Sequence, residues 1–191
     1  MKKLLLGIAA VCLAGFTFAQ DAPLWMRHSV ISPDGTTIAF TYKGDIYTVP
    51  VAGGRAMQIT TNPAYDTAPV WSPDSKRIAF ASDRMGSLDV YIVAKDGGEP
   101  RRLTTHSGSE TPLAFTDAGH VLFSAGIMPS AEAVVFPSNG QFNQVYRVSV
   151  EGGRPTMISS MPMECISINK EGAMLYQDKK GYEDYWRKHH V

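Results

Sequence analysis

The stretch SPDGTTIAFTYKGDIYTVPVAGGRAMQIT, residues 32–60, contains five landmarks that return later in the chain in the same order. They are a Ser-Pro-Asp-Gly turn, an Ile-Ala-Phe run, an Asp-x-Tyr-x-Val run, a Gly-Gly pair and an Ile-Thr ending. Residues 72–104 repeat these landmarks almost in full, and residues 116–159 repeat them in a more divergent form. A repeat of about forty residues built from short strands and turns is typical of the blades of a β-propeller.

Each landmark has a physical role in a blade of four antiparallel strands. Proline presets the backbone of the first turn, and aspartate bonds back to its own main chain. The Asp-x-Tyr-x-Val run alternates with a period of two, as a strand does. The Gly-Gly pair marks the next tight turn. No window of the sequence has a helical period, so we predict an all-β fold.

The repeats predict a partial propeller over residues 20–191. The units are expected at about 25–70, 71–114 and 115–167, with an incomplete fourth unit at 168–191. Propellers usually close their ring with four to eight blades. We therefore expect this sequence to be the front part of a longer protein or a truncated product of one. Alone, it should be poorly soluble or oligomeric, because an open ring exposes sheet edges.

The third unit carries an insertion at about residues 125–142, where the chain is 12 residues longer than in the second unit. This insertion is unusually apolar for a loop, as Ile127 and Phe136 illustrate. One interpretation is that it folds over a blade edge or packs on its own small core. The other is that it forms a docking surface for a partner domain. The first is favoured, because most apolar residues of this kind become buried.

The first nineteen residues have the pattern of a secretory signal peptide. Lys2 and Lys3 form a positive start, an apolar run too short for a comfortable membrane span follows, and Thr17 and Ala19 provide a small-x-small cleavage site. We expect cleavage after Ala19, a periplasmic or secreted location, and no stable membrane span in the mature chain.

Charge and cysteine content exclude several functional classes. The chain has 18 basic and 18 acidic residues, without the clustered basic face that nucleic-acid binding needs. Only Cys165 remains after the predicted cleavage, so no internal disulfide is possible. Its apolar surroundings in the sequence favour a buried, inert thiol over a nucleophile.

Catalytic and cofactor motifs are absent from the sequence. It contains no Gly-x-Ser-x-Gly elbow, no zinc motif, no P-loop and no dinucleotide fingerprint. The serines of the repeated turns are expected to be architectural, and His106 to be a solvated loop residue. His189 and His190 are adjacent, and adjacent side chains in a strand point to opposite faces. We predict no catalytic residue, no cofactor and no metal site in this segment.

Three acidic residues lie at or near the start of the leading strand of successive units: Asp66, Glu110 and Glu164. If the leading strands line a central channel, these acids would form a negative ring that attracts a cationic group such as a peptide amino terminus. The alternative, which the sequence favours, is that each accepts hydrogen bonds from the backbone of a neighbouring loop.

The repeat resembles the WD-like propeller repeat of TolB and of tricorn-type proteases. Two segments narrow the resemblance to the early propeller of secreted bacterial tricorn-like serine peptidases. They are the insertion ending in Phe136-Pro137-Ser138, with residues 144–155 after it, and residues 182–190, which include Trp186-Arg187-Lys188-His189-His190. TolB itself carries an α/β domain before its propeller, whereas here the repeat begins soon after the signal peptide.

The resemblance implies a non-catalytic role in a larger enzyme. In such peptidases the propeller precedes a PDZ-type domain and a serine peptidase core, so peptides or unfolded segments would be the ligands. It also implies homo-oligomeric assembly of the full-length protein. Two alternatives remain open: a TolB-like periplasmic interaction propeller, and the propeller lid of a prolyl-oligopeptidase-type hydrolase. The sequence downstream would separate these interpretations. A PDZ-like domain with a protease core would support the tricorn-like peptidase, and a stop after about six blades would support the TolB-like propeller. A Gly-x-Ser-x-Gly motif would support the hydrolase lid.

Overall fold

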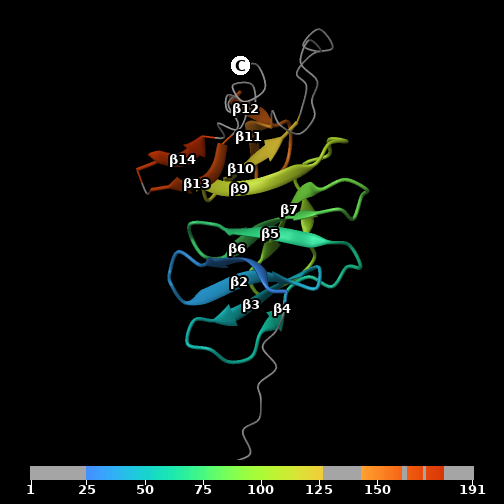
Figure 1. The fold of residues 1–191 in the computed structure, drawn as a ribbon, viewed down its shortest axis with the longest axis vertical. Coiled ribbons are helices and arrows are strands. Elements are labelled where there is room, and N and C mark those ends of the chain that lie inside the picture. Colours follow the sequence, from blue (N-terminus) through green and yellow to red (C-terminus); the bar gives the residue numbers. More distant parts are fainter. Residues whose placement is uncertain (1–24, 127–142, 161–162, 170, 179–191) are drawn as a thin grey trace, which may run out of the picture.

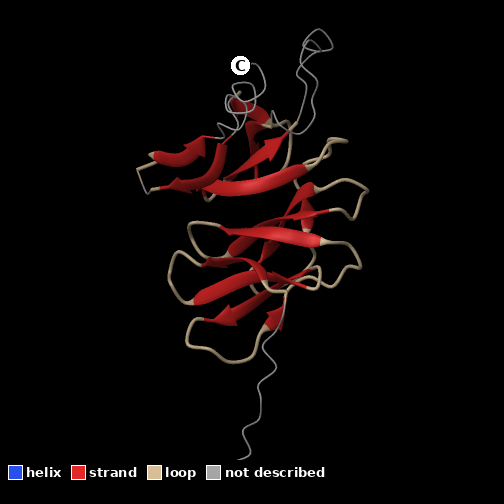
Figure 2. Ribbon diagram, viewed as in Figure 1, coloured by secondary structure: helices blue, strands red, loops and turns tan. Residues whose placement is uncertain are grey.

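The computed structural model describes residues 25–126, 143–160, 163–169 and 171–178, and these residues contain strands and turns but no helix (Figure 2). The same residues accordingly include no helical segment able to cross a membrane. The predicted signal peptide and cleavage site, most of the insertion, and His189 and His190 lie outside the described residues. The all-β prediction is confirmed.

In these described residues, fourteen strands form three four-stranded sheets and one two-stranded sheet. The first sheet contains β1 (Arg27–Ile31), β2 (Thr37–Tyr42), β3 (Asp45–Pro50) and β4 (Met57–Gln58). The second contains β5 (Asp66–Trp71), β6 (Arg77–Ser82), β7 (Asp89–Ala94) and β8 (Arg101–Arg102). The third contains β9 (Glu110–Asp117), β10 (His120–Ala125), β11 (Gln144–Ser149) and β12 (Thr156–Ser159). The last contains β13 (Met163–Ile168) and β14 (Met174–Asp178).

Strands within each sheet pair antiparallel in chain order, as hairpin-connected blades do (Figure 1). The leading strands β1, β5, β9 and β13 are in contact, each with the next. The sheets therefore follow one another like propeller blades, with neighbouring leading strands on the same side. Three complete blades and the opening of a fourth confirm the predicted architecture.

Sheet boundaries differ from the predicted units by one strand. The strand before the Ser-Pro-Asp turn of the second repeat, and that before the corresponding turn at residues 116–119, each pair with the strand after the turn, so the second sheet begins at Asp66 and the third at Glu110. The expected units placed those strands at the end of the preceding repeat, near residues 70 and 114. A repeat pattern alone does not show which strand opens a sheet, because hydrogen bonding across the turn decides it.

The serine and aspartate side chains of the Ser-Pro-Asp turns form hydrogen bonds that stabilise the turn. Ser32 donates its hydroxyl to Asp34 at 2.6 Å and accepts the main-chain N–H of Thr37 at 3.0 Å. The second turn repeats this arrangement with Ser72 and Asp74. These serines are therefore architectural, as the sequence predicted.

The hydrophobic core lies between neighbouring sheets. The second sheet is buried on both faces, because successive side chains such as Ala79 and Phe80 point to opposite sides and pack against different blades. An aromatic pair joins the second and third strands of each complete blade. The pairs, with their centroid distances, are Phe40–Tyr47 (5.8 Å), Phe80–Tyr91 (5.9 Å) and Phe123–Tyr146 (5.7 Å).

Candidate functional site

The sequence-predicted acids Asp66 and Glu110 occupy equivalent places where neighbouring blades meet. The main-chain N–H of Asp66 donates to the carbonyl oxygen of Gly44 at 2.7 Å, and that of Glu110 donates to Leu88 at 2.7 Å. Each bond joins the start of a leading strand to the loop before the third strand of the preceding blade. We call the contact between the first two sheets the first junction, and that between the second and third sheets the second junction.

At the first junction, Asp66 forms a buried ion pair with Arg84. Nη2 of Arg84 lies 3.0 Å from both carboxylate oxygens of Asp66, whose side chain is completely buried. Nε of Arg84 donates to Ser82 at 2.8 Å, and the guanidinium carbon lies 4.5 Å from the centroid of the Tyr91 ring. The guanidinium carbon also lies 5.6 Å from the centroid of the Phe80 ring. Three charge-assisted hydrogen bonds and two cation–π contacts therefore fix the arginine in place.

A second carboxyl group, that of Asp45, lies beside this pair. Burial raises its pKa, and the nearby negative charge of Asp66 raises it further, while hydrogen bonds from Thr60 and Gln58 oppose the change. The amide of Gln58 donates to Asp45 at 3.0 Å. Both carboxylates of the first junction thus have donors, and Arg84 supplies a positive charge.

The second junction also contains two carboxyl groups and an arginine, in a different arrangement. Asp89 and Glu110 are both completely buried. Nη2 of Arg102 lies 2.8 Å from Oδ2 of Asp89. The side chain of Glu110 interacts with the Thr104 hydroxyl and the Asp89 carboxyl group, but within the described residues neither its oxygens nor those of Asp89 accept a well-formed hydrogen bond. Burial raises the pKa of Glu110 from 4.5 to about 7, and the charge of Asp89 contributes to the rise.

The two junctions are built from residues that recur at a spacing of 44. In both, the threonine hydroxyl accepts the main-chain N–H of the residue after the first aspartate, Ile46 at 3.0 Å and Val90 at 2.9 Å. The recurring pairs are Asp45 and Asp89, Gln58 and Arg102, Thr60 and Thr104, and Asp66 and Glu110. The recurrence makes each junction a repeated structural unit.

The next repeat changes most of these residues. Gln144, Met157 and Ser159 take the places of Asp89, Arg102 and Thr104, and Glu164 follows near the place of Glu110. Gln144 accepts a hydrogen bond from the Tyr146 hydroxyl at 2.5 Å. Glu164 lies in β13, and its side chain is outside what the structure describes. Among the described side chains, a carboxyl pair with an arginine is therefore found at the first two junctions.

The predicted acidic ring can now be compared with these positions. Asp66 and Glu110 do lie at the same level of successive blades, but each is buried against neighbouring side chains. Glu164 cannot be added to the comparison. The role of the three acids in attracting a peptide amino terminus stays a prediction.

Sequence reasoning missed the partners of these acids. Asp45 and Asp89 were interpreted only as strand markers, and Thr60 and Thr104 only as strand endings. Their exact recurrence with the later acid was the signal that could have grouped them. Arg84 had no such signal, because it lies in a loop that has no counterpart of equal length in the first blade.

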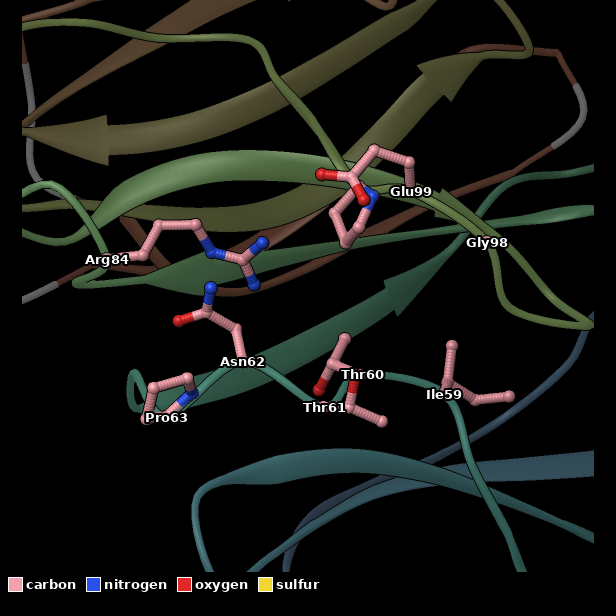
Figure 3. Close-up of a pocket in the computed structure, with 9 residues that line it drawn as sticks. Ile59, Thr60, Thr61, Asn62, Pro63, Arg84, Gly98 and Glu99 are labelled. Atoms are coloured by element: carbon pink, nitrogen blue, oxygen red, sulfur yellow. The ribbon is translucent and has the colours of Figure 1, made fainter.

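A polar groove of about 270 Å³ lies beside the first junction (Figure 3). It is lined by residues 59–63, Arg84 and residues 98–100. The guanidinium of Arg84 and the amide of Asn62 point toward one another in it, and Glu99 lies on the opposite wall. Its volume is below the usual range of small-molecule pockets, roughly 300–1,000 Å³.

Within the described residues, the chemistry of a hydrolase site is not assembled. The turn serines bond to aspartates, and the ring of the exposed His106 accepts the N–H of Gly108 at 3.0 Å. The described part of the chain contains no group of three or more His, Cys, Asp or Glu that could hold a metal ion. The junctions hold blades together and do not present a nucleophile.

Comparison with known families decides the identity of the fold. The family model described as the tricorn protease N-terminal β-propeller domain matches residues 23–190. The chain belongs to this family. The match spans both junctions and all four sheets of the tricorn-type propeller.

Curated relatives include proteins named as proteases or peptidases. The propeller is 35% identical over 102 residues to tricorn protease homolog 1 of Streptomyces coelicolor, covering 53% of this chain and 9% of that protein. It is 30% identical over 129 residues to the uncharacterized peptidase YuxL of Bacillus subtilis, covering 66% of this chain and 20% of that protein. This chain therefore spans a fifth or less of the length of these relatives.

Solved structures of other proteins contain the same fold. A putative TolB from Agrobacterium tumefaciens superposes with a TM-score of 0.66 at 18% identity, covering 82% of this propeller and 55% of that chain. At this identity the likeness shows the fold alone. The fold class and the tricorn-type or TolB-like character expected from the sequence are both confirmed.

Proposed function

We propose that this tricorn-type propeller is a non-catalytic segment of a secreted serine peptidase, where it guides or filters peptide substrates and supports assembly. The observation that carries the proposal is the family match over residues 23–190. The protease and peptidase names of the two relatives support it. In this proposal the propeller is a platform, and the reaction centre lies elsewhere in the polypeptide.

The mode of action follows from how the blades are held together. Each junction consists of a fixed ion pair or carboxyl pair and a core buried between two sheets. Blades fixed in this way form a rigid wall, which suits a filter that admits extended chains and excludes folded ones. Peptides or unfolded segments are the ligands we propose, and domains of the PDZ and serine peptidase types are the proposed partners, in a homo-oligomer.

The experiment uses the full-length native polypeptide and antibody fragments that bind the propeller. Hydrolysis of a series of peptides from short to long is measured with and without the bound fragment. A filter or guide predicts that the fragment slows cleavage of long peptides and leaves short ones unaffected. A fragment raised against another part of the polypeptide is the control. Equal rates for every length would contradict the proposed role.

A TolB-like interaction propeller is the second candidate. Its support is the superposition with TolB structures and a 55-residue match, 44% identical, to the Tol-Pal system protein TolB of Bordetella pertussis. It predicts a native polypeptide without peptidase activity. The propeller lid of a prolyl-oligopeptidase-type hydrolase would instead bring peptidase activity with a Gly-x-Ser-x-Gly motif downstream. The TolB-like propeller and the hydrolase lid both agree with the secreted or periplasmic location that we propose from the amino-terminal sequence.

A further inference from the structure

Asp89 and Glu110 bring two carboxyl groups together across the second junction. Asp89 begins β7 in the second blade, and Glu110 begins β9 in the third blade. Both side chains are completely buried, and the main-chain N–H of Glu110 donates to the carbonyl oxygen of Leu88, the residue before Asp89, at 2.7 Å. Within the described residues, none of the four carboxylate oxygens of Asp89 and Glu110 accepts a well-formed hydrogen bond. Two negative charges placed side by side, away from water, repel each other strongly.

The nearby positive charge is insufficient for two carboxylates. Arg102 pairs with Asp89 at 2.8 Å, and Thr104 contributes a hydroxyl group near Glu110. Within the described residues, neither carboxylate oxygen of Glu110 accepts a well-formed hydrogen bond. A buried acceptor without a donor is costly, about 1–3 kcal/mol for each group. A proton on one of the two carboxyl groups would supply the missing donor and remove the second charge.

The first junction provides an internal comparison. There Arg84, from the loop between the second and third strands of its own blade, neutralises the leading-strand acid Asp66. The corresponding loop of the third blade spans residues 126–143 and contains no lysine or arginine. Glu110 thus lacks the type of cation that neutralises its counterpart.

In the part of the chain that the structure describes, other charged groups around Glu110 do not replace that cation. From the neighbouring blade, Tyr91 interacts with the charges of both junctions, and its pKa is raised mainly by burial. On β10, His120 lies at the far end of the strand and pairs with Asp117 at 3.0 Å. On β13 the titratable groups near the start of the strand are Glu164 and Cys165, whose side chains are not described.

We propose that Asp89 and Glu110 hold one shared proton, that this proton fastens the second blade to the third, and that its loss loosens the junction. The proton forms an O–H···O⁻ hydrogen bond between the two carboxyl groups, and it passes to solvent when the junction opens at higher pH. Because the two carboxyl groups interact, the proton belongs to the pair and not to either residue alone.

The direction of the pH effect follows from linkage. The pKa of Glu110 is about 7 in the folded chain and 4.5 for the free side chain. A group whose pKa is raised by folding stabilises the fold fully below the unfolded value and loses that contribution as pH rises through the folded value. The opening constant of the second junction should therefore increase by up to about tenfold per pH unit between pH 4.5 and 7, and level off above it.

The test compares the whole chain with its Glu110→Gln variant, because glutamine has the size of a protonated glutamic acid and cannot lose the proton. Hydrogen exchange of the amides in β8 and β9 is measured from pH 5 to 8 and corrected for intrinsic exchange. We expect opening of these strands to rise with pH in the parent chain and to be independent of pH in Glu110→Gln. Glu99→Gln, at an exposed position, is the matched control and should behave as the parent.

Infrared spectroscopy of the parent chain provides a measurement that needs no variant. A buried protonated carboxyl group gives a C=O stretching band distinct from that of carboxylates. We expect this band at pH 6, its loss by pH 8, and its absence from Glu110→Gln. Absence of the band at pH 6 in the folded parent chain would overturn the proposal, and so would the same pH dependence of exchange in Glu110→Gln and the parent.

Discussion

Arg84 donates through a single nitrogen to both carboxylate oxygens of Asp66, at 3.0 Å each, while its guanidinium group stacks on Tyr91. The pair joins the loop after β6 to the start of the leading strand of the same blade, next to the first junction. Asp66 is completely buried, so removing the arginine would leave a negative charge without a partner in the protein interior.

Arg84→Ala should therefore destabilise the chain by about 3–5 kcal/mol, which is the typical cost of breaking a buried ion pair on one side. Urea unfolding of the parent and variant measures this change. The matched control is Arg101→Ala, because Arg101 pairs with Glu151 where both side chains are exposed, 48% and 74%. The control should lose less than about 1 kcal/mol. Equal losses for the two variants would contradict the structural role of Arg84.

Thr104→Val should weaken the second junction without changing the volume of the side chain greatly. The Thr104 hydroxyl accepts the main-chain N–H of Val90 at 2.9 Å, and both groups are buried. Valine leaves this N–H without a partner, at a cost of about 1–3 kcal/mol. Thr105→Val, at the neighbouring exposed position, is the control. Equal melting temperatures for the two variants would show that the hydrogen bond contributes nothing to the stability of the fold.

Asp74 should contribute to the loss of stability in acid. Hydrogen bonds, first from the Ser72 hydroxyl and then from the Lys76 main chain, hold the pKa of Asp74 below its ordinary value of 3.8. A group whose pKa is lowered by folding stabilises the fold above the unfolded value and loses that contribution as pH falls through the folded value. Unfolding of Asp74→Asn should consequently depend less on pH below about 4 than unfolding of the parent. Superimposable acid-unfolding profiles would exclude this contribution.

The hypothesis of an acidic ring has its own test in the full-length protein. If Asp66 and Glu110 attract peptide amino termini, Asp66→Asn and Glu110→Gln should reduce any preference for peptides with a free amino terminus over acetylated ones. Rates for both peptide types are compared in the parent and in each variant, after their folding has been verified. Unchanged discrimination in both variants would remove the functional role and leave the structural one.

Local sequence patterns predicted much of the fold. The turn formed by Ser72 and Asp74, the alternating strand from Asp89, and the breaks at Gly-Gly depend on neighbouring residues, so a single repeat contains the information. Pairing between repeats carries no such local signal. The choice of Asp66 as the first residue of a sheet depends on hydrogen bonds across the turn to β6.

The candidate site was predictable only in part, for the same reason. Asp66 and Glu110 were identified because they recur before the turn. Their partners Arg84 and Arg102 come from different strands and loops, and only the folded blades bring them close. Among the described residues, the same acid position is neutralised by an arginine at one junction and lacks such an ion pair at the next, which no repeat pattern could indicate.

The most direct test of the central claim is capture of the native polypeptide with an antibody against residues 25–126, followed by measurement of its mass and its peptidase activity. The account predicts a polypeptide several times longer than this chain, found in the envelope or secreted fraction, that cleaves peptides and is inactivated by a serine-directed reagent. A captured polypeptide of any length without peptidase activity would contradict the account and favour the TolB-like interaction propeller.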